Sequence, residues 1–185
     1  VHEGASIILI DKDAPGLEIV RNSAVGPYVE QGNGVHAYLR FTDCRVPAEN
    51  LLGEEGKGFL VAQTRLGGGR IHHAMRSVCV LKKAMDMMCE RVLSRTTKGE
   101  LLANKQFTQE KISDTYTQIM QYRLHVLYTA WLIDKYKEYN REVRKEIAAI
   151  KAATPKILQD VIYRAMHMHG SLGMSDELPF MNMWA

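Results

Sequence analysis

The sequence predicts a mainly α-helical protein: an up-and-down four-helix bundle preceded by a few antiparallel β-strands. Two observations predict this class. Between residues 5 and 46, short apolar or alternating runs are separated by glycine-rich turns, which is typical of strands. From Gly58 onward, apolar residues recur at steps of three and four, the period of an amphipathic helix. The period changes near Gly53–Gly58, so we expect one domain at residues 1–56 and an incomplete helical domain at residues 57–185.

Three segments of the first domain are predicted to be strands. Ser6–Ile10 is a continuous apolar run and should be a buried strand. Leu17–Val25 alternates less regularly, and Val35–Val46 alternates well. Gln31–Gly34 (QGNG) between them is a strong turn signal. We therefore expect roughly three antiparallel strands, which need a partner surface to be stable.

Three long helices are predicted in the second domain, with the start of a fourth. They run from Gly58 to about Val92, from about Lys105 to Tyr136 and from about Arg141 to His169, and another begins at Leu178. A helix of about 30 residues is about 45 Å long. Such lengths are typical of an up-and-down bundle.

Two helical segments have special features. Around Val126–Ile133, apolar residues point in nearly every direction, so this part should be the central helix of the bundle. Pro155 lies inside the third helix and removes one backbone hydrogen bond, so a kink is expected there.

Composition excludes several classes of function. The net charge is +3, and basic residues are interspersed with acidic ones, which does not favour nucleic-acid binding. No apolar run approaches the ~20 residues of a membrane span. Cys79 and Cys89 lie in an apolar helical pattern and are expected to be core residues in a reducing compartment. The chain begins without methionine and stops in an apolar run, so we expect a piece of a larger polypeptide.

Five ordered segments resemble the acyl-CoA dehydrogenase family. They are FTDCRVPAENLLGEEGKGF, LGGGRIHHAMR, CERVLSRTTKGELLANKQF, EIAAIKAATPKI and HMHGSLGMSDELP. They occur in the family's order and at its spacing from about Ala5 to the end, and GRIHHAMR is most similar to longer-chain members. An unrelated four-helix bundle with a β appendage explains the periodicity but not this ordered set.

The resemblance implies a fold, a reaction and partners. Residues 1–56 would be the last strands of the family's middle β-domain, and residues 57–185 most of its C-terminal helical domain. Such enzymes remove the α-hydrogen of an acyl-CoA as a proton and the β-hydrogen as a hydride to FAD, giving the trans-2-enoyl-CoA in β-oxidation of fatty acids. They are homodimers or homotetramers that pass electrons to an electron-transfer flavoprotein or a similar acceptor. A mitochondrial or peroxisomal location is typical, and a cytoplasmic one is open.

The first cofactor segment implied by the resemblance is SRTTKG. Arg95 and Thr97 match the family's Arg-x-x-Phe-Gly turn, which meets FAD from the adjacent subunit, and a guanidinium suits a pyrophosphate. Lys98 replaces the usual aromatic residue. Alternatively, Arg95 is a solvated cation at a helix C-terminus. Gln106 aligns with a glutamine that approaches the cofactor.

The second cofactor segment is HMHGSLGMS, which resembles the family's Gln-x-x-Gly-Gly-x-Gly turn. Gly170 and Gly173 match, and their backbone would come close to FAD. His167 stands where glutamine is usual, and Ser171 where the second glycine is usual. The alternative for Gly170 is a plain helix cap.

Substrate contacts implied by the resemblance are Leu66 and Arg70, beside the acyl-CoA channel. Gly67–Gly69 indicate either a close approach by ligand or another helix, or an interruption of the helix. Metal binding by His72–His73 is not expected, because adjacent side chains diverge by about 100° on a helix.

No catalytic residue is assigned. Most members carry the base, a glutamate, in a loop beyond the helix that starts at Leu178, and some carry it immediately before the arginine matched by Arg70. Gly69 occupies that second position and cannot take a proton, so this chain alone should be inactive. The alternative is a truncated or degenerate relative that acts as a helical oligomerisation or interaction module.

Overall fold

The computed structural model describes residues 4–23 and 36–184, so the turn predicted at Gln31–Gly34 lies outside them. By internal contacts the chain divides into two compact units, within residues 1–66 and 67–184. The division falls inside a long helix, and the domain boundary expected near Gly53–Gly58 stays a prediction. None of the described helices is long and apolar enough to cross a membrane.

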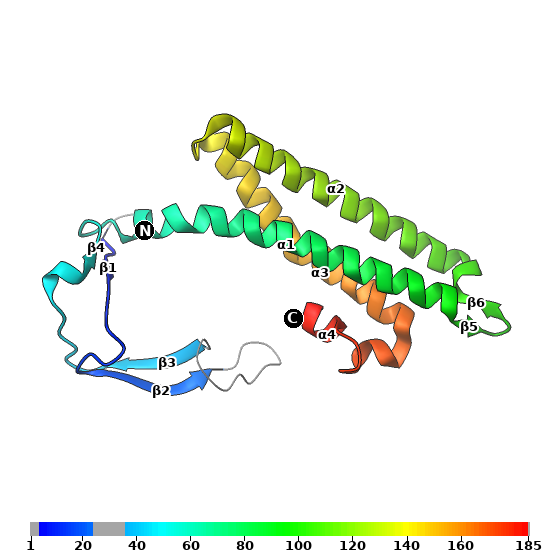
Figure 1. Cartoon of the computed structure of the whole chain (residues 1–185), viewed down its shortest axis with the longest axis horizontal. Coiled ribbons are helices and arrows are strands. Elements are labelled where there is room, and N and C mark those ends of the chain that lie inside the picture. Colours follow the sequence, from blue (N-terminus) through cyan, green and yellow to red (C-terminus); the bar gives the residue numbers. More distant parts are fainter. Residues whose placement is uncertain (1–3, 24–35, 185) are drawn as a thin grey trace. The chain divides into compact units, whose positions relative to one another are not determined.

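The first unit contains two separate antiparallel strand pairs (Figure 1). Its strands are β1 (Ile7–Ile8), β2 (Leu17–Ser23), β3 (His36–Phe41) and β4 (Leu51–Leu52). β2 pairs with β3, and the register shifts between Ile19 and Arg21. β1 pairs with β4. The expected antiparallel pairing is confirmed, but the partner of β1 lies more than 40 residues away, and local patterning cannot reveal it.

The run Ser6–Ile10 was expected to be buried, and this was wrong in the described chain. Only Ile7–Ile8 form a strand, and Ile8 and Leu9 are 51% and 55% exposed. All six residues of β3 are exposed as well. A two-stranded pair satisfies backbone groups on one edge but covers neither face, so an apolar sequence alone does not ensure burial.

The three long helices have the predicted lengths. They are α1 (Gly58–Ser94), α2 (Gln106–Tyr136) and α3 (Arg141–His169), followed by the short α4 (Phe180–Trp184). Between α1 and α2 lie β5 (Thr96–Thr97), β6 (Glu100–Leu101) and a 3₁₀ turn at Leu102–Asn104. A second 3₁₀ turn, Gly170–Met174, follows α3. Figure 1 shows α1, α2 and α3 running side by side in the second unit. The mainly helical class is confirmed.

A side-chain cap explains where α3 begins, and the helix continues through an internal proline. The Asn140 side chain accepts a hydrogen bond from the Val143 N–H at 2.9 Å, which caps the first turn. Pro155 lies inside α3 and leaves the carbonyl four residues earlier without its usual donor. The helix is nevertheless assigned without a break from Arg141 to His169.

One hydrophobic core joins the helices of the second unit. Its fully buried residues come from α1, α2, α3 and α4: Ala74, Leu81, Ala84, Met88, Val126, Ile150, Val161, Ile162, Ala165 and Phe180. Tyr122 on α2 crosses this core, and its hydroxyl lies 2.6 Å from the Thr154 hydroxyl on α3. It also donates to the Ala74 carbonyl on α1 at 3.3 Å. This buried network ties three helices together.

Two expectations about burial were wrong. The segment Val126–Ile133 is not surrounded by protein within this chain, since Leu127, Tyr128 and Trp131 are 43%, 45% and 53% exposed. α2 buries only the face that carries Thr115, Ile119, Tyr122, Val126 and Thr129. Cys79 is exposed rather than a core residue, because it lies off the buried stripe of α1.

Candidate functional site

The segment Arg95–Leu101 forms a tight hairpin, which we call the Arg95 hairpin. Lys98 and Gly99 have φ angles of 51° and 83°, so the two-residue turn between β5 and β6 is of the primed type I. Arg95 precedes β5, and its carbonyl accepts from the Leu102 N–H at 2.9 Å. The hairpin therefore fixes the backbone at Arg95 and Thr97, and Lys98 lies exposed at its tip.

Two predicted site residues distant in sequence lie at the same end of the bundle. Gln106 begins α2 and is exposed, and its neighbour Phe107 packs edge-on against the His167 ring of α3 at 6.4 Å. Tyr163, one turn earlier on α3, stacks with the His167 ring at 6.3 Å between ring centroids. The Arg95 hairpin leads into α2 at this end (Figure 1), so both cofactor segments predicted from sequence lie at the same end of the bundle.

The turn Gly170–Met174, called the Gly170 turn below, uses its two glycines differently. Gly170 ends α3 with a φ of 65°, and a Cβ built there meets nothing within 4 Å. Its role as a helix cap is confirmed, and the space beside it is open. Gly173 is buried, and a Cβ there would lie 2.4 Å from the Met166 carbonyl oxygen. Close packing therefore explains Gly173, whereas Ser171 between them is exposed.

Arg91 and His169 lie behind this surface and were not singled out from the sequence. His169 is buried, donates from Nδ1 to the Ala165 carbonyl at 2.7 Å and packs on Phe180 at 4.8 Å. Burial, and further the positive charge of Arg91, lower the pKa of His169. The Arg91 Nε is buried without a hydrogen-bond partner in the described part of the chain. The only feature of the sequence that could have pointed to Arg91 is its position four residues before Arg95.

The predicted substrate residues belong to α1. Leu66 is 41% exposed and ends the first unit, whereas Arg70 belongs to the second. The helix runs unbroken through Gly67–Gly69, so the interruption considered from the sequence was wrong. A Cβ on Gly67 would lie 3.0 Å from the Tyr139 ring, so at this position another part of the chain makes the close approach.

His73, one of the two adjacent histidines, has a side-chain partner on the next turn of α1. The Arg76 Nη2 lies 2.9 Å from the His73 Nδ1 and donates to it. Desolvation and then the Arg76 charge lower the pKa of His73, which is itself exposed. No cluster of three or more metal-binding side chains occurs among the residues described.

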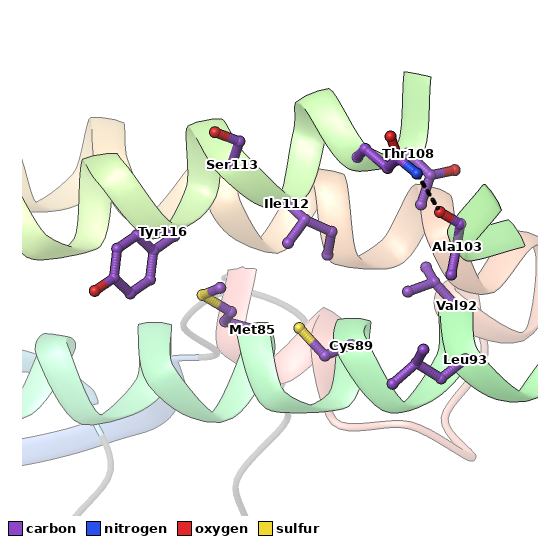
Figure 2. A pocket seen from close by; sticks show the side chains of 10 residues that line it. Met85, Cys89, Val92, Leu93, Ala103, Thr108, Ile112, Ser113 and Tyr116 are labelled. Carbon is purple, nitrogen blue, oxygen red and sulfur yellow. Dashed lines mark hydrogen bonds between the residues drawn. The ribbon is translucent and has the colours of Figure 1, made fainter. Parts of the chain in front are cut away.

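A groove of about 510 Å³ between α1 and α2 adjoins the Arg95 hairpin (Figure 2). Its wall is almost entirely apolar and includes Met85, Cys89, Ile112 and Tyr116. Burial raises the pKa of the Cys89 thiol, so this cysteine is held in its neutral form. The sequence could not predict this groove, because it depends on how two helices pack.

The features of this helical end fit a bound dinucleotide. Arg95, Gln106, His167 and Gly170 are exposed, and a phosphate-bearing ligand would find cationic and amide donors there. The charge and donor chemistry are therefore those that a pyrophosphate requires.

Comparisons with known proteins identify the family. The model of the acyl-CoA dehydrogenase C-terminal domain matches residues 56–185. The "Probable acyl-CoA dehydrogenase FadE2" of Mycobacterium tuberculosis is 40% identical over 99% of this chain and 44% of its own length. "Acyl-CoA dehydrogenase family member 11" of Rattus norvegicus is 39% identical over all of this chain and 23% of its own length.

A solved structure of a protein assigned as an acyl-CoA dehydrogenase from Mycobacterium abscessus superposes with a TM-score of 0.88 and 36% identity. That match covers 97% of this chain and 43% of the other. The chain thus spans less than half the length of these relatives. The helical topology, the ordered motifs and these matches together show that the chain belongs to the acyl-CoA dehydrogenase family.

Proposed function

We propose that this chain supplies the helical part of an FAD-dependent acyl-CoA dehydrogenase that converts acyl-CoA thioesters to trans-2-enoyl-CoA. The observation that carries the proposal is the contact of Phe107 with His167 at 6.4 Å. It brings the segments that bear Gln106 and Gly170 to one end of the bundle, next to the Arg95 hairpin. In the family these segments meet one FAD, lent by a neighbouring subunit.

Each residue has a distinct role in this proposal. Arg95 offers the pyrophosphate a guanidinium fork that donates two parallel hydrogen bonds. The Thr97 hydroxyl and the Gln106 amide donate to the same dinucleotide. Gly170 lets the backbone approach closely because no side chain fills the open space.

His167 and Ser171 replace residues usual in the family, and they can still act as donors. The His167 ring contacts both Phe107 and Tyr163, which restricts its orientation. The Ser171 hydroxyl is exposed and can donate one hydrogen bond. Gly173 contributes to the shape of the turn through its packing against Met166.

The substrate side rests on fewer observations. Leu66 and Arg70 would contact the acyl-CoA along its channel, with Arg70 as the cationic group. FAD supplies the hydride acceptor when it is bound. We assign no catalytic base to this chain, since Gly69 lacks a proton-accepting group. The base would have to come from sequence outside these 185 residues.

The wider context follows from the family. We propose a homodimer or homotetramer, because the dinucleotide is shared between subunits. An electron-transfer flavoprotein or a similar acceptor would reoxidise the flavin. A mitochondrial or peroxisomal site in fatty-acid β-oxidation fits this role best.

The proposal is tested on the polypeptide that contains this chain. The purified protein should carry flavin absorption that an acyl-CoA bleaches anaerobically. Arg95→Met should weaken FAD binding about tenfold, the worth of one charge-assisted hydrogen bond. Arg144→Met, an exposed arginine at the start of α3, is the matched control and should bind FAD normally. A colourless protein that neither takes up FAD nor responds to acyl-CoA would end the proposal.

A second function, a non-catalytic helical interaction module, is favoured by one observation. α2 has an exposed stripe of large apolar side chains opposite its buried face, formed by Leu124, Leu127, Tyr128 and Trp131. Tyr128 stacks on Trp131 at 5.9 Å, so the stripe is locally ordered. Loss of self-association in Trp131→Lys without any flavin binding in the wild type would select this function over the enzyme.

A further inference from the structure

We propose that the groove between α1 and α2 binds a single-chain amphiphile with an anionic head, a long-chain carboxylate. Its hydrocarbon chain lies in the apolar groove beside the Arg95 hairpin, and its carboxylate meets two cations farther from the hairpin. The proposal goes beyond the proposed function, because none of the residues assigned there to FAD or to acyl-CoA lines this groove.

The first observation is the length of the groove. It shares Met85 and Tyr116 with a smaller pocket of about 290 Å³, so the groove and the pocket are continuous. We call the two together the α1–α2 trough, which extends along residues 82–93 of α1 and 108–123 of α2. At about 1.5 Å per residue, these stretches are about 17 and 22 Å long. An extended acyl chain measures about 15 Å, half of the ~30 Å hydrocarbon core of a bilayer, so the trough is long enough for one chain.

The second observation is the apolar half of the trough, next to the Arg95 hairpin. Val92 and Thr108 at its floor are 4% exposed, whereas Leu93 at its rim is 65% exposed. Figure 2 shows Met85 of α1 and Ile112 of α2 pointing into it from opposite sides. Its volume of about 510 Å³ is within the range of small-molecule sites. A polar group placed here would lose its hydrogen bonds with water, so this half selects a hydrocarbon chain.

The third observation is the charge at the other end of the trough. Lys82 of α1 and Arg123 of α2 line the smaller pocket, with Asp86 as the single carboxylate in its lining. None of these three residues has an ion pair among the residues that the structure describes. Two cations and one anion leave a net positive charge, which attracts an anionic head group. A carboxylate can accept hydrogen bonds from both cations.

The size of the trough favours a small molecule over a protein partner. Ten residues line the groove and seven line the pocket, with two in common. A stable protein interface takes about 20–30 residues from each side. The exposed apolar stripe of α2, formed by Leu124, Leu127, Tyr128 and Trp131, includes no residue of the trough lining. The trough is therefore a separate feature of the same helix.

The experiment measures the binding of cis-parinaric acid, a fluorescent long-chain carboxylate, to the polypeptide that contains this chain. Decanoate, hexadecanoate and uncharged hexadecanol are the competitors. Hexadecanoate should displace the probe better than hexadecanol does, because only the carboxylate meets the cations. Lengthening the chain beyond decanoate should improve displacement about two- to fourfold per methylene until the chain exceeds the trough.

Substitutions in the trough locate the ligand. Met85→Trp fills the apolar half and should weaken binding about tenfold, the worth of about two buried methylenes. Lys82→Gln and Arg123→Gln should each weaken it about two- to fivefold, as expected for an exposed ion pair. Asp86→Asn removes the one repulsive charge and should strengthen binding by a similar factor. High salt should reduce all three charge effects.

Two control substitutions should leave probe binding unchanged. Lys83→Gln removes a cation that is exposed beside Lys82 but lies outside the trough lining. Arg70→Gln alters the acyl-CoA channel expected in the parent polypeptide. A loss of affinity in Arg70→Gln with none in Lys82→Gln and Arg123→Gln would place the carboxylate in that channel and overturn the proposal.

The remaining outcomes are equally decisive. Absence of saturable binding in the wild type, or wild-type affinity in a folded Met85→Trp, overturns the proposal. If a second copy of the chain covers the trough, the wild type will not bind the probe, and Met85→Trp will change the oligomeric state in size-exclusion chromatography. Circular dichroism checks the folding of Met85→Trp. Should that variant be unfolded, the exposed Lys82 and Arg123 decide, and unchanged affinity in both glutamine variants refutes the site.

Discussion

Replacing Tyr122 by phenylalanine removes one buried hydroxyl and leaves the ring in place. That hydroxyl lies 2.6 Å from the Thr154 Oγ1 and donates to the Ala74 carbonyl at 3.3 Å. Thr154 in turn donates to the Ile150 carbonyl at 2.7 Å, so its own proton is used, and the single Tyr122 proton is shared between the Thr154 oxygen and, at the longer distance, the Ala74 carbonyl. Burial, opposed by the Thr154 hydrogen bond, raises the pKa of Tyr122, so the phenol stays neutral.

The expected cost follows from one short hydrogen bond and one long one. A net contribution of about 1 kcal/mol for the short bond, and a fraction of that for the long one, gives a loss of about 1–1.5 kcal/mol. The aromatic ring keeps its apolar contacts, so no cavity term is added. Urea unfolding monitored by circular dichroism measures the loss as a lower transition midpoint at unchanged slope.

A control substitution and a double-mutant cycle test this prediction further. Tyr163 is 65% exposed, so Tyr163→Phe should leave the midpoint within experimental error. A double-mutant cycle with Thr154→Val should give a coupling free energy of about 1 kcal/mol between the two hydroxyls. Equal midpoints for Tyr122→Phe and Tyr163→Phe would refute the view that this network holds three helices together.

Four further substitutions test packing and charge. Gly173→Ala should destabilise the fold by about 1–3 kcal/mol, since its Cβ would lie 2.4 Å from the Met166 carbonyl oxygen. Gly68→Ala, with open space around it, should instead stabilise α1 by about 0.5–1 kcal/mol. The two variants should therefore shift the melting temperature in opposite directions. Because burial lowers the pKa of His169 below its ordinary 6.5, the unfolded chain takes up this proton first, so stability should fall as pH drops below that value, and His169→Gln should flatten this part of the pH profile. Hydrogen bonding from His125 lowers the pKa of Glu146. Glu146→Gln should therefore lower the free energy of unfolding by about 0.5–1 kcal/mol near neutral pH. The difference should vanish once acid has protonated the carboxylate, which acid titrations of both proteins measure.

The helices could be predicted because the spacing of apolar residues at three and four positions is a local property of the sequence. The bounds expected for the second and third helices agree with Gln106–Tyr136 and Arg141–His169 to within a residue. Each of these segments buries one stripe, and period alone defines such a stripe. The core stripe of α3 was likewise foreseen, since Val143, Ile147 and Ile150 are buried.

The strand pairing and the exposed face of α2 were not predictable in the same way. β1 pairs with β4, and a run of apolar residues carries no information about a partner so far along the chain. The exposed Trp131 and Tyr128 are as apolar as core residues, so composition alone assigned them to the interior. Burial depends on which surfaces meet, and only the packed helices decide that.

The amino-acid order alone determined the family, the helical period and the segments that bear Arg95, Gln106, His167 and Gly170. The tertiary structure alone decided that Phe107 meets His167 and that the Arg91 Nε is buried without a partner among the residues described. The physical reason is that backbone periodicity and motif spacing are properties of neighbours along the chain. Hydrogen-bond satisfaction instead depends on atoms that only folding brings together.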